Sequence, residues 1–129
     1  MARPEDCLFT KTHEWVHREG DEVLVGISTF AQQELGDIVY VNLGETGRGL
    51  KTGEQLGEIE SVKAVAEVYA PVSGSVVAVN AVLADSPEKV NKDPYGDGWL
   101  ARIKLQAPAE LDGMMNFAAY TKYMAEEGH

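Results

Sequence analysis

Residues 57–71 read Gly-Glu-Ile-Glu-Ser-Val-Lys-Ala-Val-Ala-Glu-Val-Tyr-Ala-Pro, with a single lysine, Lys63, near their centre. Side chains alternate with a period of two on both sides of this lysine, which is the pattern of two short β-strands. The turn expected at residues 62–64 lacks the Asn-Gly or Asp-Gly pair that most tight hairpins use. The stretch therefore predicts a β-hairpin with Lys63 at its tip, where the amine is either a solvated charge or a point of attachment.

The chain before this hairpin predicts a second hairpin, a short helix and a further strand. Alternating runs at residues 14–18 and 22–27 flank a charged loop and indicate two strands. Ser28 stands at the N-cap position of a short helix, and Gly36 is placed to end that helix. Residues 37–42 are rich in β-branched side chains and predict a strand, which glycine-rich turns follow.

A short internal repeat relates two of the predicted strands. Gly36-Asp-Ile-Val-Tyr-Val-Asn42 and Gly74-Ser-Val-Val-Ala-Val-Asn80 share glycine, valine and asparagine positions at a constant offset of 38 residues. The repeat has two interpretations. It is a chance likeness between two β-branched strands that each follow a glycine, or it marks two related halves on either side of the Lys63 hairpin.

The last third of the chain predicts a mixture of helix and strand. Ser86 and Pro87 have the residue types of a helix start, and residues 99–105 alternate as a strand. Residues 108–127 predict a C-terminal helical segment, with an amphipathic helix over 116–126. This helix is expected to pack against the core through the side chains of Met115, Ala118, Ala119 and Tyr123.

Size and charge limit the classes of function. The 129 residues are 44% hydrophobic and carry a net charge of −10, which fits one folded domain over residues 1–129. An acidic chain does not suit nucleic acid or an anionic membrane, because phosphate binding needs a basic patch. We therefore expect protein partners with basic docking faces, and neither a nucleic acid nor a membrane partner.

The expected compartment follows from the cysteine count and from the N-terminal residues. Cys7 is the one cysteine of the sequence, so no disulfide can form within the chain and a reducing compartment fits best. No apolar signal core and no run long enough to span a membrane is present in the sequence. We expect a cytoplasmic protein.

A metallopeptidase is the rival interpretation of one motif. His13-Glu14-Trp15-Val16-His17 matches the zinc-binding pattern H-E-x-x-H, in which a helix places both histidines on one face. The segment is instead expected to be a strand, because it contains Trp and Val and stops at Gly20. We expect no metal site, and a metal analysis of the purified protein would exclude the rival.

Several motifs resemble, in order and spacing, those of glycine cleavage system H proteins. Around the lysine the motif is Glu60-Ser-Val-Lys-Ala64, without the Asp-Lys-Ala signature of 2-oxoacid dehydrogenase lipoyl domains or the Ala-Met-Lys-Met signature of biotin domains. The other motifs are Thr12-His-Glu-Trp15, Gly36-Asp-Ile-Val39, Ala70-Pro-Val-Ser-Gly74, Val79-Asn80 and Val90-Asn-Lys-Asp-Pro-Tyr-Gly-Asp-Gly-Trp99. The resemblance covers nearly the whole chain.

The resemblance implies a mostly β fold: a flattened lipoyl/biotinyl-type barrel-sandwich of two antiparallel sheets, with short helices and a C-terminal helix. It implies that lipoic acid is amide-linked to Lys63, within an attachment motif that also contains Glu60, Ser61, Val62 and Ala64. The chain would then be a single lipoyl-carrier domain and not an enzyme.

The partners implied by the resemblance are the proteins of the glycine cleavage system. They are the PLP-dependent glycine decarboxylase (P protein), the aminomethyltransferase (T protein) and the dihydrolipoamide dehydrogenase (L protein). A lipoate ligase or an octanoyl/lipoyl transferase would supply the lipoyl group, and the carrier itself is expected to be a monomer. The alternative is an H-like relay module that supplies lipoyl groups to other enzymes.

The resemblance further implies a cleft for the loaded arm. In the family the ammonium of the aminomethyl group meets acidic residues, and the matching positions are Glu14 and Glu67, with Thr12 close by. Position 67 is an aspartate in some members, so the glutamate found here is a departure from that pattern. The alternative is that both glutamates are solvated side chains of a very acidic protein.

Overall fold

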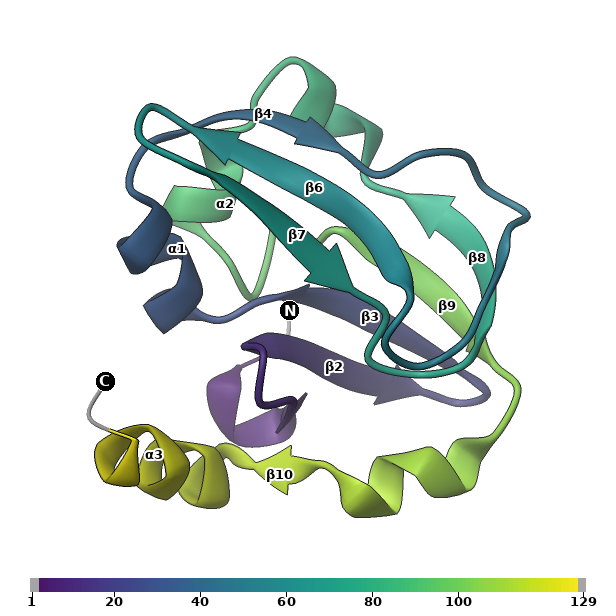
Figure 1. Cartoon of the computed structure of the whole chain (residues 1–129). Coiled ribbons are helices and arrows are strands. Elements are labelled where there is room, and N and C mark those ends of the chain that lie inside the picture. Colours follow the sequence, from purple (N-terminus) through teal and green to yellow (C-terminus); the bar gives the residue numbers. More distant parts are fainter. Residues whose placement is uncertain (1–2, 128–129) are drawn as a thin grey trace.

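Two antiparallel β-sheets of unequal size form the fold (Figure 1). The computed structural model describes residues 3–127. The seven-stranded sheet has the order β10-β1-β2-β3-β9-β8-β5, and the three-stranded sheet has the order β4-β6-β7. The strands are β1 (Leu8–Phe9), β2 (Glu14–Glu19), β3 (Glu22–Ile27), β4 (Ile38–Asn42), β5 (Gly49–Leu50), β6 (Gln55–Ser61), β7 (Val65–Tyr69), β8 (Gly74–Val79), β9 (Ala101–Leu105) and β10 (Met115–Asn116).

Short helices close the ends of the sandwich, and a longer one follows the last strand. They are η1 (Pro4–Asp6), α1 (Thr29–Leu35), η2 (Ala81–Ala84), α2 (Lys89–Lys92), η3 (Pro108–Gly113) and α3 (Phe117–Glu126). Among residues 3–127, no helix is long and apolar enough to cross a membrane. The predicted barrel-sandwich with short helices and a C-terminal helix is confirmed.

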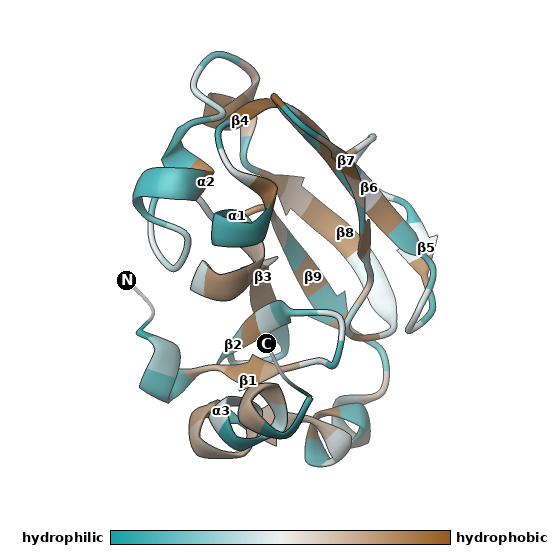
Figure 2. Cartoon of the chain, turned by 60° about the vertical axis from the view of Figure 1, so that its left-hand side comes forward, coloured by the Kyte–Doolittle hydropathy of each residue, from teal (hydrophilic) through white to brown (hydrophobic). Residues whose placement is uncertain are grey.

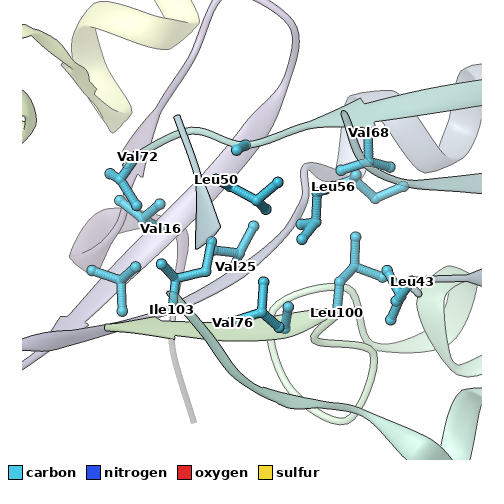
Figure 3. Close-up of a cluster of buried hydrophobic side chains, with 14 of the residues drawn as sticks. Val16, Val25, Leu43, Leu50, Leu56, Val68, Val72, Val76, Leu100 and Ile103 are labelled. Atoms are coloured by element: carbon cyan, nitrogen blue, oxygen red, sulfur yellow. The ribbon is translucent and has the colours of Figure 1, made fainter. Parts of the chain in front are cut away.

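The main core lies between the inner faces of the two sheets. Figure 2 shows apolar residues along their strands, and Figure 3 shows Val16, Val25 and Ile103 facing Leu56 and Val68 across the interior. All five side chains are buried. Full burial of such side chains contributes about 1.5–3 kcal/mol each, so this contact is the main force that holds the sheets together.

The large sheet is also covered on its outer face, beneath α3. Trp15 and Phe9 belong to a second cluster together with Cys7 and Tyr120. Because successive residues of a strand point to opposite faces, Trp15 packs under α3 while its neighbour Val16 enters the main core. The N-terminal half of β2 is therefore buried on both faces.

The repeated segments occupy equivalent positions in different sheets. β4 is an edge strand of the small sheet and β8 lies in the large one. The register of β4 shifts between Ile38 and Tyr40, and that of β8 shifts between Val76 and Ala78, the same positions of the repeat. A β-bulge at the same place in both copies favours two related halves over a chance likeness.

The predicted first hairpin and first helix are confirmed. β2 and β3 pair directly, and the Ser28 hydroxyl accepts a hydrogen bond from the Ala31 N–H at the start of α1. Gly36 ends this helix with a φ of 79°, a left-handed value that glycine adopts without strain.

Two details of the later helices differ from the prediction. α2 begins at Lys89 and not at Pro87, because the residues before it form only single turns, such as the hydrogen bond from Lys89 N–H to the Ser86 carbonyl. In α3, Ala118 and Ala119 are exposed, and the buried side chain is Tyr120. Met115 and Tyr123 pack against the cluster that contains Tyr120, as predicted. The prediction is wrong for the two alanines, because alanines fit either face whereas the large Tyr120 ring must be buried.

Replacing Gly26 tests the packing of the double-sided strand. A Cβ atom at Gly26 would lie 2.5 Å from the Trp15 ring, which has buried neighbours on its other side. We expect Gly26→Ala to lower the free energy of unfolding by about 1–3 kcal/mol, as overpacking does. Urea denaturation measures the effect. The matched control is Gly49→Ala, where a Cβ meets nothing within 4 Å, and equal losses in the two variants would contradict this account.

Candidate functional site

Lys63 lies at the tip of the β6–β7 hairpin, as the sequence predicts (Figure 1). The Ser61 N–H donates to the Ala64 carbonyl at 2.8 Å, and the Ser61 hydroxyl accepts from the N–H groups of Lys63 and Ala64 at 3.3 and 3.1 Å. The Ser61 hydroxyl stabilises this turn by accepting two backbone hydrogen bonds, so the turn closes without an Asn-Gly pair. The Val62 N–H donates to the Asp37 carbonyl at 3.0 Å and anchors the tip to the start of β4.

The surroundings of Lys63 fit a lysine that is acylated. Its side chain is exposed and forms no ion pair with the residues described, 3–127. Its stem runs beside Gly36, where a Cβ would lie 3.5 Å from the lysine Cε. Val62 and Val65 next to it are 71% and 61% exposed, which is unusual for valine. An amine without a competing carboxylate, on an apolar tip, is accessible to an acylating enzyme.

The other residues of the attachment motif lie around the turn. Glu60 is half-buried and stands between Tyr40 of β4 and Val65 of β7 in the small sheet. Ala64 is exposed at the end of the turn. The motif is therefore a compact structural unit in which Ser61 fixes the backbone and the neighbouring side chains remain accessible.

Glu14 is a buried carboxylate at the start of β2. Its residue is only 2% exposed. One carboxylate oxygen accepts hydrogen bonds from the hydroxyls of Thr10 at 2.6 Å and Thr12 at 2.5 Å, and the other accepts from the Tyr69 N–H at 3.3 Å. The prediction that Thr12 lies close to Glu14 is thus met by direct contact, and the alternative of a solvated Glu14 is wrong.

The electrostatics of Glu14 are those of a charge without a counterion. Burial raises the pKa of this carboxyl, and the hydrogen bonds from Thr10, Thr12 and Tyr69 oppose that rise only in part. None of the ion pairs among residues 3–127 includes Glu14. Ionised Glu14 therefore attracts any cation that can reach it.

A cleft of about 210 Å³ gives access to Glu14. One wall is the start of β2 with β7, and the opposite wall is α1. Polar lining comes from Thr12, His13, Glu14, Glu34 and Glu67. The remaining lining is apolar and comes from Ile27, Phe30, Ala31, Leu35, Ile59, Ala66 and Val68. The cleft thus combines three carboxylates with a mostly apolar lining.

The structure brings Glu14, Glu67 and Thr12 together in this cleft. Glu67 is exposed, and one of its oxygens accepts a hydrogen bond from the Tyr69 hydroxyl at 2.7 Å. Four residues separate Glu67 from Lys63, so their Cα atoms lie at most about 14 Å apart. Glu67 thus brings the lining of the cleft close to the hairpin tip.

The sequence analysis missed Tyr69, which contacts both carboxylates. Its backbone N–H donates to Glu14 and its hydroxyl donates to Glu67. The period of two along β7 places residues 67 and 69 on one face, and that signal predicts the side-chain contact. The contact with Glu14 joins the edge of the small sheet to the large sheet, which no local pattern indicates.

Residues 14–17 of the H-E-x-x-H motif lie on a strand, as predicted, whereas the first histidine of the motif lies outside it. His13 precedes β2 with a φ of 75°, and both His13 and His17 are half-buried. Glu14 has its carboxylate bound by hydroxyl and amide donors. Over residues 3–127, no group of three metal-binding side chains is positioned to hold an ion.

A barrel-sandwich that displays a lysine on a hairpin beside an acidic cleft belongs to the class of lipoyl-type carrier domains. The family model described as "Glycine cleavage H-protein" matches residues 7–127. The chain therefore belongs to the glycine cleavage H-protein family, which confirms the family predicted from its motifs.

Similar proteins match this chain over nearly their full length. The glycine cleavage system H protein of Nitratidesulfovibrio vulgaris (strain Miyazaki F) is 49% identical over 129 residues and covers 100% of both chains. That of Anaeromyxobacter sp. (strain K) is 47% identical over 98% of this chain and 99% of its own. The crystal structure of a glycine cleavage system H protein from Mycobacterium marinum is 36% identical, with a TM-score of 0.84 over 98% of this chain and 100% of that one.

Removing the charge of Glu14 should stabilise the fold at neutral pH. A carboxyl whose pKa is raised by folding holds its proton more tightly in the folded state, so stability is lost as pH rises through that pKa. We expect Glu14→Gln to increase the free energy of unfolding at pH 7.5 by about 0.5–2 kcal/mol, a typical stabilising increment. The gain should shrink as the pH falls toward about 4.5.

Urea denaturation at pH 7.5 and pH 5 measures both quantities. Glu45→Gln is the matched control, because Glu45 is an exposed loop residue. We expect the control to change stability by less than about 0.5 kcal/mol at either pH. A Glu14→Gln variant less stable than wild type at pH 7.5 would show that the hydrogen bonds outweigh the cost of burying the charge.

Proposed function

We propose that this chain is the lipoyl carrier of a glycine cleavage system, and that it acts as a single domain over residues 1–129 with lipoic acid covalently attached to Lys63. Membership of the glycine cleavage H-protein family supports the role. Two observations support the site most directly. Lys63 is exposed at a hairpin tip, Glu14 is buried nearby, and neither forms an ion pair with the residues described. A carrier of a cationic cargo needs both features.

When bound, the lipoyl group supplies the thiols that carry the aminomethyl group of glycine between enzymes. The chain itself binds and shields this cargo. Glu14 stabilises a cationic amine in the cleft, because a charge-assisted hydrogen bond in a poorly solvated site is stronger than one in water. Hydrogen bonds from Thr10, Thr12 and the Tyr69 N–H orient the carboxylate and favour its ionised form. The apolar walls formed by α1 and β7 keep water from the cargo.

Partner proteins perform every chemical step in this proposal. They are the glycine decarboxylase, the aminomethyltransferase, the dihydrolipoamide dehydrogenase, and the ligase or transferase that lipoylates Lys63. Glu58, Glu60 and Glu67 lie on the hairpin that carries the lysine, and none forms an ion pair with the residues described. With a net charge of −10, a cytoplasmic monomer of this kind attracts basic docking faces.

Lys63→Arg tests the attachment site. Arginine keeps the charge but has no amine that a lipoyl-transferring enzyme acylates. We expect the variant to gain no mass on treatment with lipoate ligase, ATP and lipoate, and to fold like wild type because Lys63 is exposed. Intact-mass spectrometry measures the modification. Lys51→Arg, an exposed lysine on a loop, is the control and should be lipoylated fully. A mass gain in Lys63→Arg would assign the attachment to another lysine.

Glu14→Gln tests the shielding role. Losing one charge-assisted hydrogen bond of about 1.5–3 kcal/mol predicts a roughly 10- to 100-fold faster loss of the aminomethyl cargo from the isolated, loaded carrier. The decay is followed by mass spectrometry after glycine decarboxylase has been removed. Glu58→Gln on the neighbouring strand is the matched control and should leave the decay unchanged. An unchanged decay rate in Glu14→Gln would contradict the clamp.

Glycine decarboxylase distinguishes the proposal from the relay alternative. We expect the lipoylated wild type to support exchange of bicarbonate into glycine with that enzyme, and Lys63→Arg to support none. A fully lipoylated carrier that glycine decarboxylase does not accept, but that donates its lipoyl group to other enzymes, would assign the relay role instead.

A further inference from the structure

A buried hydroxyl of the C-terminal helix α3 bonds to two residues beside the acidic cleft. Tyr120 is 1% exposed, and its hydroxyl lies 2.7 Å from His13 Nδ1 and 2.8 Å from Ser28 Oγ. Burial raises the pKa of this phenol to about 12, so the hydroxyl keeps its proton at physiological pH. It therefore donates one hydrogen bond and accepts the other.

The first partner, His13, lies in the loop that connects β1 to β2 and precedes Glu14 directly. His13 has a φ of 75°, the left-handed conformation that a non-glycine residue adopts at a cost of about 1–2 kcal/mol. Its N–H donates to the Thr10 carbonyl, and the Thr10 N–H donates to the Glu14 carbonyl, so residues 10–14 form a tight connection between β1 and β2. Both hydroxyls that hold Glu14, those of Thr10 and Thr12, lie in this connection.

The second partner, Ser28, controls the opposite wall of the cleft. Its Oγ caps α1 by accepting the Ala31 N–H at 3.2 Å, and its own N–H donates to the His13 carbonyl at 3.0 Å. Phe30 and Ala31 of this helix line the cleft, and the Phe30 ring packs 4.8 Å from the His13 ring. The Tyr120 hydroxyl thus bonds to His13, which lines the cleft, and to the N-cap residue of the helix that forms the opposite wall.

We propose that Tyr120 is a positioning residue of the acidic cleft, which uses its hydroxyl to hold the Glu14 loop and the first turn of α1 at a fixed separation. The ring of Tyr120 is stacked on Phe9, with centroids 4.4 Å apart and planes 6° from parallel. The ring packs α3 against Phe9, and the hydroxyl holds the two walls of the cleft. Tyr120→Phe separates these roles, because it keeps the ring and removes only the hydroxyl. This inference rests on the proposed carrier function for its importance, but the geometry can be tested without any lipoyl group.

The first test is amide hydrogen exchange by NMR in the unlipoylated protein. We expect Tyr120→Phe to speed exchange at least tenfold at Ser28, Ala31 and Tyr69, whose N–H groups bond to His13, Ser28 and Glu14. Amides of the β8–β9 pair, such as Ile103, should be unchanged. Tyr40→Phe is the matched control, because Tyr40 is 48% exposed on β4, and it should change none of these amides.

A purely structural tyrosine gives a different pattern. Uniform acceleration over the whole chain, or acceleration confined to α3, would overturn the proposal. The His13 imidazole signals provide a second spectroscopic readout, because loss of the partner at Nδ1 should shift them in Tyr120→Phe but not in Tyr40→Phe. Unchanged imidazole signals in Tyr120→Phe would also count against the proposal.

The second test measures the lifetime of the aminomethyl cargo on the loaded, isolated carrier. We expect Tyr120→Phe to shorten it at least threefold, and to add little further in a Glu14→Gln background, since both act through one carboxylate. If Glu14→Gln shortens the lifetime and Tyr120→Phe does not, the positioning role is wrong. If neither variant changes the lifetime while the exchange pattern is as expected, the shielding function fails and the positioning of the walls by Tyr120 stands.

Discussion

A carboxylate buried without a counterion is the constraint on which the functional half of this structure depends. Glu14 is 2% exposed, and its carboxylate accepts hydrogen bonds from two threonine hydroxyls and one backbone N–H. Such a group opposes folding when ionised, so a sequence under selection for stability alone would replace it. Its cost is explained if the cation arrives with the cargo, and the cleft that surrounds it has the walls that such an arrangement requires.

The scaffold holds this carboxylate and the lysine at a fixed distance. Lys63 stands at one end of β7, and the Tyr69 N–H at its other end bonds to Glu14 on the opposite sheet. β7, Val65–Tyr69, therefore lies between the displayed lysine and the buried carboxylate. The apolar core between the sheets keeps this spacing, because Val16 next to Trp15 and Val68 next to Tyr69 both belong to it. Core packing therefore determines the relative position of Lys63 and Glu14.

Local patterns predicted much of the chain correctly. The period of two identified the hairpin around Lys63 and the pair β2–β3, and the residue types Ser28 and Gly36 marked the ends of α1. Prediction was weaker for residue types that occur in more than one environment or backbone conformation. Ala118 and Ala119 gave no signal that Tyr120 faces inward, and Ser86-Pro87 resembled a helix start although the backbone there forms only single turns. The position of the bulges in β4 and β8 required the pairing itself.

By itself, the sequence determined the elements, the displayed lysine and the family, because alternation, capping residues and short motifs are local properties of a chain. It also identified Thr12, Glu14 and Glu67 as a group, but only through resemblance. The tertiary structure alone decided that Glu14 is buried, that Tyr69 contacts Glu14, and that Tyr120 bonds to His13 and Ser28. These contacts join residues 55, 107 and 92 positions apart. Burial and hydrogen bonding over such separations depend on how the two sheets and α3 pack, which no local pattern specifies.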